Sequence, residues 1–256
     1  MEKGEKMKNI QERGLRFFDA HVDGKYLYFS ARNFNGLFRV EIGKSEAEFL
    51  GHFREEAILQ KNLHRQVFCI DNYLYFVPYT GKGISIYDKV NKVFSFVNVH
   101  KKEKGIVSKA YLINRDILMI PFELSDPFIL FHTYDNTCEK LSNLRNNICM
   151  RFLKQRNVLL GLYSSCIAEN KLFIKGGEGI ILSIELETWQ VFAHKLPKTY
   201  KIRSLYIDKK EIYLTVSDEC LVIRWNFRDD TCYEYRIDAK SMEHPYMSIL
   251  RWGAHL

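Results

Sequence analysis

The chain has 256 residues, of which 46% are hydrophobic and 14% aromatic, and its formal net charge is +7 at pH 7. With 14 Gly and 5 Pro, this composition excludes a fibrous or disordered protein, and the length fits one all-β domain. No apolar run approaches the roughly 18 residues that span a membrane, so we expect no membrane segment.

The N-terminal residues 1–14 are polar and of mixed charge, and we expect a tail there before a single domain over 15–256. This tail lacks the apolar core of a signal peptide, which predicts a cytoplasmic protein. The six cysteines include no C-x-x-C pair. They fit reduced thiols that are buried as small apolar side chains.

Four short apolar runs in a row show the unit from which the domain is built. The runs 66–70 and 73–77 are rich in β-branched and aromatic residues. They flank the turn Asp71-Asn72 and predict a hairpin. Two more runs, 84–87 and 93–99, follow after further turns. All four are too short for typical helices, so we expect four consecutive strands.

The same pattern recurs along the chain at intervals of about 40 to 50 residues. Its first hairpin turn falls at Asp23-Gly24, Asp71-Asn72, Asn114-Arg115, Glu169-Asn170 and Asp208-Lys209. A four-strand repeat of this length is typical of a β-propeller blade. We therefore predict an all-β fold, a β-propeller with five four-stranded blades. The blades are expected at about 15–53, 65–99, 109–144, 163–196 and 201–237.

Three segments fall outside these blades. The stretch 246–252 predicts a lone strand. Either five blades close and this strand packs outside them, or it joins the N-terminal segment in an incomplete sixth blade; descent from a longer six-bladed protein is a third alternative. Spaced apolar residues over 55–63 predict one helical turn, and 145–162 fits either a strand or a short helix.

One blade resembles a named repeat. Lys175-Gly176-Gly177, followed by Trp189 in the expected fourth strand, is similar to the glycine pair and downstream Trp of kelch repeats. The resemblance implies a β-propeller. The other four blades lack the glycine pair, so no functional residues follow from it.

Basic residues concentrate in the segments between blades. In a propeller these segments share one face with the loops between second and third strands, and loops on a rigid scaffold commonly carry recognition. Aromatic residues on this face could stack on sugars or bases, or fold back over the end of the fold. The candidate binding residues are Arg65, Lys101, Lys102, Lys104, Arg151, Lys154, Arg156, Lys198, Lys201, Arg203, Phe34, Tyr79 and Tyr200.

This basic face predicts a non-enzymatic binding or scaffolding module for an anionic partner, which would be an acidic protein, a glycan or a nucleic acid. Ordinary solubilising charge is the other interpretation of the same residues. The sequence leaves the oligomeric state open, and it contains no metal-binding, nucleotide-binding or hydrolase motif. We therefore expect no cofactor and no metal.

Two further hypotheses stay open. The first is a propeller enzyme that acts on glycans or lactones at the channel mouth. The second is a degenerate propeller that acts only in assembly. Acid and base groups for the enzyme would come from Glu123, Asp126, Glu178, Asp218 and Glu219.

Overall fold

The structure is a computed structural model that describes residues 14–99, 107–123, 126–152, 161–177, 179–208, 210–216 and 219–236. The chain divides into two compact units, Met1–Lys140 and Leu141–Leu256. The division falls near the end of the third predicted blade, 109–144.

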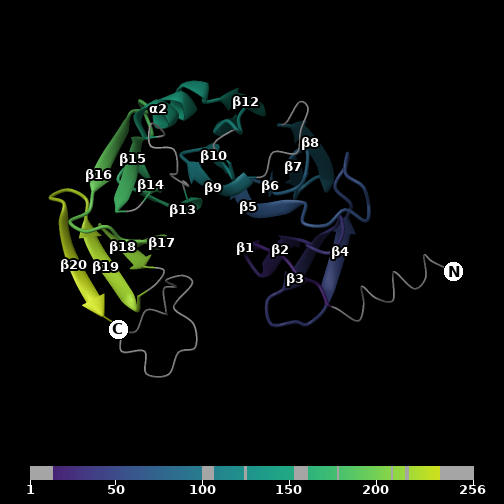
Figure 1. The fold of residues 1–256 in the computed structure, drawn as a ribbon. Coiled ribbons are helices and arrows are strands. Elements are labelled where there is room, and N and C mark those ends of the chain that lie inside the picture. Colours follow the sequence, from purple (N-terminus) through teal and green to yellow (C-terminus); the bar gives the residue numbers. More distant parts are fainter. Residues whose placement is uncertain are drawn as a thin grey trace. The chain divides into compact units, whose positions relative to one another are not determined.

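The first unit holds three four-stranded antiparallel sheets, coloured from purple to teal in Figure 1. In each sheet the strands pair in chain order. The strands are β1 (Ala20–Asp23), β2 (Tyr26–Ser30), β3 (Leu37–Glu41) and β4 (Ala47–Gly51); β5 (His64–Ile70), β6 (Tyr73–Pro78), β7 (Gly83–Asp88) and β8 (Val93–Asn98); and β9 (Val107–Ile113), β10 (Asp116–Pro121), β11 (Ile129–His132) and β12 (Thr137–Lys140).

The second unit begins with a helix and holds two more sheets of the same kind. Its elements are α2 (Ser142–Phe152), β13 (Gly161–Ala168), β14 (Lys171–Gly177), β15 (Ile180–Glu185) and β16 (Val191–Lys195), then β17 (Ile202–Asp208), β18 (Glu211–Val216), β19 (Leu221–Asn226) and β20 (Thr231–Arg236). Within the described ranges, no helix has the length and apolar character that crossing a membrane requires.

The five predicted four-stranded blades are confirmed, and their first hairpin turns show why. Asp71, Asn114 and Asn170 adopt left-handed backbone conformations, with φ of 54°, 55° and 60°. Asp and Asn tolerate this conformation better than most residues, and it suits a tight hairpin turn. In the first blade the turn lies one residue later than predicted, because Asp23 ends β1 and Gly24 takes the positive φ of 57°.

Two local predictions differ from the structure, and a third segment follows one of its two alternatives. Residues 55–63 form turns without a helix, since Glu55 and Asn62 have φ of 64° and 56°, outside the helical region. The segment at 145–162 is helical in its first part, and α2 starts at Ser142, inside the predicted third blade. Trp189 precedes β16 with φ of 56°, so its expected place in a fourth strand is wrong. The stretches 1–13 and 246–252 lie outside the described residues.

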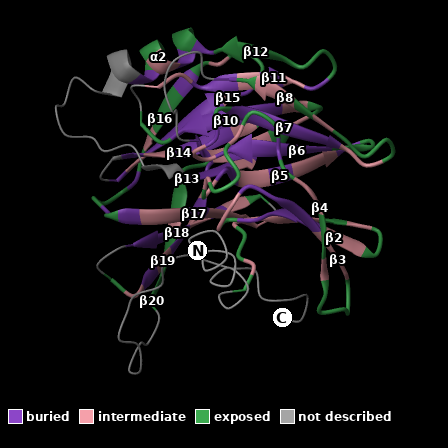
Figure 2. Cartoon of the chain, turned by 90° about the vertical axis from the view of Figure 1, so that its right-hand side faces the viewer, coloured by how far each residue is buried: buried purple, intermediate pink, exposed green. Residues whose placement is uncertain are grey.

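The core of each unit lies between neighbouring blades. The central strands β6 and β10 are buried at every position after the first, because both faces of a blade are covered by side chains (Figure 2). In the second unit Phe173 and Trp225 meet edge to face, with ring centroids 5.8 Å apart. In the first unit Phe53 and Phe76 do the same at 5.0 Å. These aromatic contacts join one blade to the next.

The first strands of successive blades lie side by side within each unit, β1, β5 and β9 in the first and β13 and β17 in the second. They belong to separate sheets, so their facing backbone N–H and C=O groups are not paired in a common sheet. A side chain must hydrogen-bond to these groups instead. Gln66 of β5 does so for Ala110 of β9. The Ala110 amide donates to Gln66 Oε1 at 2.5 Å, and Gln66 Nε2 donates to the Ala110 carbonyl at 3.2 Å.

Ion pairs join neighbouring blades at the hairpin-turn end of the strands. Lys89 Nζ lies 2.5 Å from Asp23 Oδ2, with the Lys89 side chain 13% exposed. Arg115 pairs with Asp71, but both side chains are more than 60% exposed.

We expect Lys89→Met to lower the free energy of unfolding by about 1–2 kcal/mol, because a shielded charged hydrogen bond is lost. Arg115→Met should cost less than about 0.5 kcal/mol. Urea unfolding of both variants tests this, and equal costs would contradict it.

Candidate functional site

Three connections gather at the opposite end of the first unit: the β2–β3, β4–β5 and β6–β7 loops. The backbone amide of Asn35 donates to the Ile58 carbonyl at 2.9 Å, and the backbone amide of Asn62 donates to the Arg32 carbonyl at 2.8 Å. The amide of Tyr79 donates to the Leu63 carbonyl at 2.7 Å. The loops that the sequence placed on one face therefore do meet in this unit.

Asn35 organises these loops from inside. Its side chain is fully buried. Its Nδ2 donates to the carbonyls of Phe53 and Glu56 at 2.9 and 3.0 Å, and its Oδ1 accepts from the Phe53 amide at 2.8 Å. The connection contains no helix or strand that could satisfy these backbone groups, so the side-chain amide takes that role. The loop surface is consequently fixed in shape.

Four side chains on this surface form what we call the arginine–aromatic cluster: Phe18, Arg32, Arg65 and Tyr79. The Phe18 and Tyr79 rings meet edge to face, with centroids 5.4 Å apart. The guanidinium carbon of Arg32 lies 4.4 Å from the Phe18 centroid. That of Arg65 lies 5.2 Å from Phe18 and 5.3 Å from Tyr79. Both cations therefore stack on aromatic rings, an arrangement that fixes a guanidinium while leaving its N–H edge available.

The cluster carries positive charge that its described neighbours do not neutralise. Arg32 Nε donates to Asn62 Oδ1 at 2.8 Å, a neutral acceptor. The nearby Asp19 carboxylate accepts instead from the Val67 amide at 3.0 Å. Within the described ranges neither Arg32 nor Arg65 forms an ion pair. A planar anion such as a carboxylate is the ligand that two such guanidinium groups suit.

The cluster contains two of the residues expected from the sequence, Arg65 and Tyr79. Sequence reasoning missed Phe18 and Arg32, although Arg32 belongs to a loop already assigned to this face. Phe34 does not join the cluster. It is half-buried against Phe38, edge to face at 5.7 Å, as expected for an aromatic residue that folds back.

In the second unit, Tyr200 is only 5% exposed, so of the two interpretations given for the loop aromatics it follows the second and folds back. Its hydroxyl donates to Glu234 Oε1 at 2.5 Å; burial and this hydrogen bond hold the pKa of Tyr200 above its usual range. Lys198 also contacts Glu234 Oε1, at 2.6 Å, so its charge is compensated. Lys201 is exposed, Arg203 is half-buried, and both interact with neighbouring residues.

Six candidate residues remain, and the structure describes the position of one of them. Arg151 lies in α2, in the second unit. The other five lie outside the described residues: Lys101, Lys102, Lys104, Lys154 and Arg156.

The enzyme hypothesis requires a catalytic group of side chains, and the second unit contains one arrangement that resembles such a group. Ser183 Oγ lies 2.8 Å from His194 Nε2, and His194 Nδ1 lies 3.4 Å from Asp230 Oδ1. This is the atom order of a serine hydrolase triad. However, Ser183 lies within β15 and is only 1% exposed, so a substrate has no access to it. The buried Ser183–His194 hydrogen bond is therefore a structural contact.

Three of the five carboxylates suggested for catalysis lie in the described residues. Glu123 and Asp126 belong to one turn, in which the Asp126 amide donates to the Glu123 carbonyl at 3.1 Å. Glu219 precedes β19, whereas Glu178 and Asp218 lie outside the described residues. The described ranges contain no group of three or more His, Cys, Asp or Glu side chains that could hold a metal ion.

The cysteines are less buried than the sequence predicts. Among those with described side chains, Cys166 alone is buried, and Cys138 is exposed on β12. The edge position of β12 explains the exposure of Cys138, because the outer strand of a blade is covered less than its central strands.

No protein-family model matches the sequence, and no curated protein matches it. Among solved structures, the chain is similar to YCF48 in a structure with a bound D1 peptide. The TM-score is 0.63 at 10% identity, over 90% of this chain and 70% of that chain.

The extracellular domain of BT4673 from B. thetaiotaomicron is also similar. It is described in one structure as part of a one-component system and in another as part of a hybrid two-component system. The TM-scores are 0.60 and 0.59 at 12% and 13% identity, over 90% of this chain. The chain spans 29% and 28% of those chains, less than a third of their length. At such identities the likeness concerns the fold alone, and the fold is a β-propeller.

Proposed function

We propose that the protein is a non-enzymatic binding module whose arginine–aromatic cluster binds an acidic segment of a partner protein. The observation that carries this proposal is the stacking of Arg32 and Arg65 on one ring, Phe18, while neither forms an ion pair with a described carboxylate. The structure of YCF48 with a bound peptide supports a protein ligand, since the two chains share a fold. The cytoplasmic location stays a prediction.

The geometry favours a protein ligand over a nucleic acid or a glycan. Stacking on bases or sugars requires an open aromatic face. Phe18 already contacts two guanidinium groups and the Tyr79 ring. What the cluster can still offer is the N–H edge of each guanidinium, which suits the carboxylates of Asp and Glu side chains. Arg and Tyr are also enriched among the residues that dominate protein interfaces.

We expect Arg65→Gln to weaken binding of an acidic peptide about tenfold, the loss of one charge-assisted contact. The probe is a fluorescein-labelled peptide of alternating Glu, Gly, Asp and Ser, followed by fluorescence anisotropy with the full chain. Arg65→Lys should not restore affinity, because lysine lacks the planar fork. Affinity should also fall as salt rises.

Arg115→Gln is the matched control, since Arg115 is an exposed arginine at the hairpin-turn end of the strands. It should bind the peptide like the unmodified chain. Two results would overturn the proposal: peptide affinity independent of salt, or equal losses for the Arg65 and Arg115 variants. Retention on heparin without peptide binding would instead favour a glycan or nucleic acid.

A further inference from the structure

A second surface of the first unit lies along β8, the outermost strand of the second blade. β8 pairs with β7 on one side, in the register Gly83↔Asn98 to Asp88↔Val93. Its other side forms the edge of the sheet. In the described part of the chain, no further strand pairs with it there. An antiparallel edge strand presents backbone N–H and C=O groups that can pair with another extended chain.

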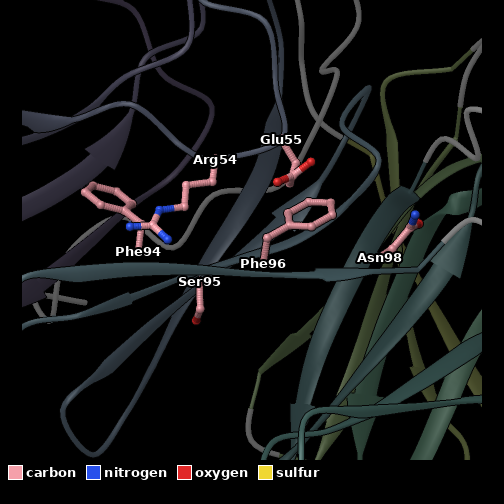
Figure 3. Close-up of a pocket in the computed structure, with 6 residues that line it drawn as sticks. All are labelled: Arg54, Glu55, Phe94, Ser95, Phe96 and Asn98. Carbon is pink, nitrogen blue, oxygen red and sulfur yellow. The ribbon is translucent and has the colours of Figure 1, made fainter.

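A groove of about 520 Å³ lies beside this edge (Figure 3). Arg54 and Glu55 of the β4–β5 connection form one wall, and β8 forms the floor. Phe94 and Phe96 point toward that wall while Ser95 points away, as the two-residue period of a strand requires. The groove is open, and four of its six lining residues follow β8 from Phe94 to Asn98, as an extended peptide beside the strand would.

The floor of the groove is held rigidly. The Phe94 ring contacts Tyr87 and Phe53, with centroids 4.9 and 5.7 Å away. It also lies against Gly51, where an added Cβ would come within 2.8 Å of the ring. The Phe96 ring lies against Gly83 in the same way, at 2.9 Å. A ligand strand would therefore meet a preformed surface, which lowers the entropic cost of binding.

The wall of the groove carries one charge of each sign. Arg54 and Glu55 are both exposed, and neither forms an ion pair with any residue in the described ranges. Arg54 lies near Phe94 and Glu55 near Phe96 (Figure 3). Lys82 Nζ donates to the Glu55 carbonyl at 2.6 Å and fixes this part of the wall. The order of charges along β8 is therefore set by the fold.

We propose that the edge of β8 accepts an extended segment of a partner protein as a fifth strand of the blade. The segment carries Asp or Glu facing Arg54 and, two positions away, Lys or Arg facing Glu55. Side chains two apart in a strand lie on one face about 6.5 Å apart. Main-chain hydrogen bonds supply affinity, and the two charges supply register. The surface uses no residue of the arginine–aromatic cluster, so it does not depend on the proposed function.

The test uses two labelled heptapeptides, Thr-Val-Glu-Val-Lys-Val-Thr and Thr-Val-Lys-Val-Glu-Val-Thr, with the full chain and fluorescence anisotropy. One charge order should bind at least about tenfold better than the same peptide with Gln at both charged positions. The alternate backbone amides of the peptide form two sets, one on each edge of the strand. N-methylation of one set should abolish binding and that of the other should leave it intact, since only one edge of the peptide pairs with β8. Failure of both charge orders, or equal effects of the two methylation sets, would overturn the proposal.

Variants of the chain locate the site. Arg54→Glu should reduce binding of the preferred peptide about tenfold, and replacing the peptide glutamate by lysine should restore it. Phe192→Ser is the control, because Phe192 is 44% exposed on the outer strand β16 of another blade. It should leave binding unchanged. A loss caused by Arg65→Gln without one from Arg54→Glu would place the peptide on the arginine–aromatic cluster and overturn the β8 site.

Discussion

Replacing Asn35 by alanine is expected to lower the free energy of unfolding by about 3 kcal/mol or more. The variant loses three hydrogen bonds to the backbone of Phe53 and Glu56. Each buried polar group left without a partner costs about 1–3 kcal/mol. Phe53 is itself 2% exposed, so water cannot readily replace the lost amide. For a typical domain stability of about 5–15 kcal/mol, this is a severe loss.

Asn33→Ala provides a matched control on the same loop. Asn33 makes a single exposed hydrogen bond, from Nδ2 to the Gly14 carbonyl at 3.2 Å. Its replacement should change the free energy of unfolding by less than about 0.5 kcal/mol. Urea unfolding should show a lower midpoint for Asn35→Ala at an unchanged slope. Similar midpoints for the two variants would show that Asn35 does not organise the loops.

The second large effect concerns pH and His64. This side chain is buried, with Nδ1 2.8 Å from Ser30 Oγ and Nε2 3.1 Å from Ser85 Oγ. The Phe53 ring packs edge to face against it at 4.4 Å. Burial away from water lowers the pKa of His64 to about 3, because the charged imidazolium cannot be solvated there. The folded protein therefore keeps His64 neutral over a range in which the unfolded chain becomes charged.

The direction of the pH effect follows from this difference. In the unfolded chain His64 gains a proton as pH falls through about 6.5, whereas the folded state does not until about pH 3. The unfolded state is favoured progressively over that window. Between pH 7 and pH 5 we expect His64 to remove about 2 kcal/mol of stability. Stability is fully retained above the unfolded pKa.

Comparison with His64→Gln isolates this contribution. The variant should be less stable at pH 7, because glutamine fits the buried site poorly. Between pH 7 and pH 5, however, it should lose about 2 kcal/mol less stability than the unmodified chain. Imidazole signals in NMR should show neutral His64 in the folded protein at pH 5. A protonated signal at that pH, or equal pH dependence for both proteins, would contradict the assignment.

The blades were predictable because their signals are local. Asp71-Asn72 and Glu169-Asn170 fit tight turns through their own side chains, and the apolar runs beside them have the length of strands. The sequence does not decide between helix and strand for the segment that forms α2, because it shows no clear apolar stripe. The helical turn predicted for the 55–63 connection is wrong for the opposite reason. Its spaced apolar residues suggest a helical turn, but tertiary bonds such as that from Asn35 to Ile58 hold it in another conformation.

The sequence by itself determined that this protein is a five-bladed all-β repeat and that Arg65 and Tyr79 belong to its loop face. Only the tertiary structure decided which side chains surround these two residues. Phe18 and Arg32 join them because successive first strands pack side by side and the connections are tied together. Tyr200 is buried, and its hydroxyl donates to Glu234, a residue 34 positions away. Turn chemistry and strand patterning are encoded in neighbouring residues. Exposure, stacking and charge compensation depend on contacts between distant residues, which spacing along the chain does not reveal.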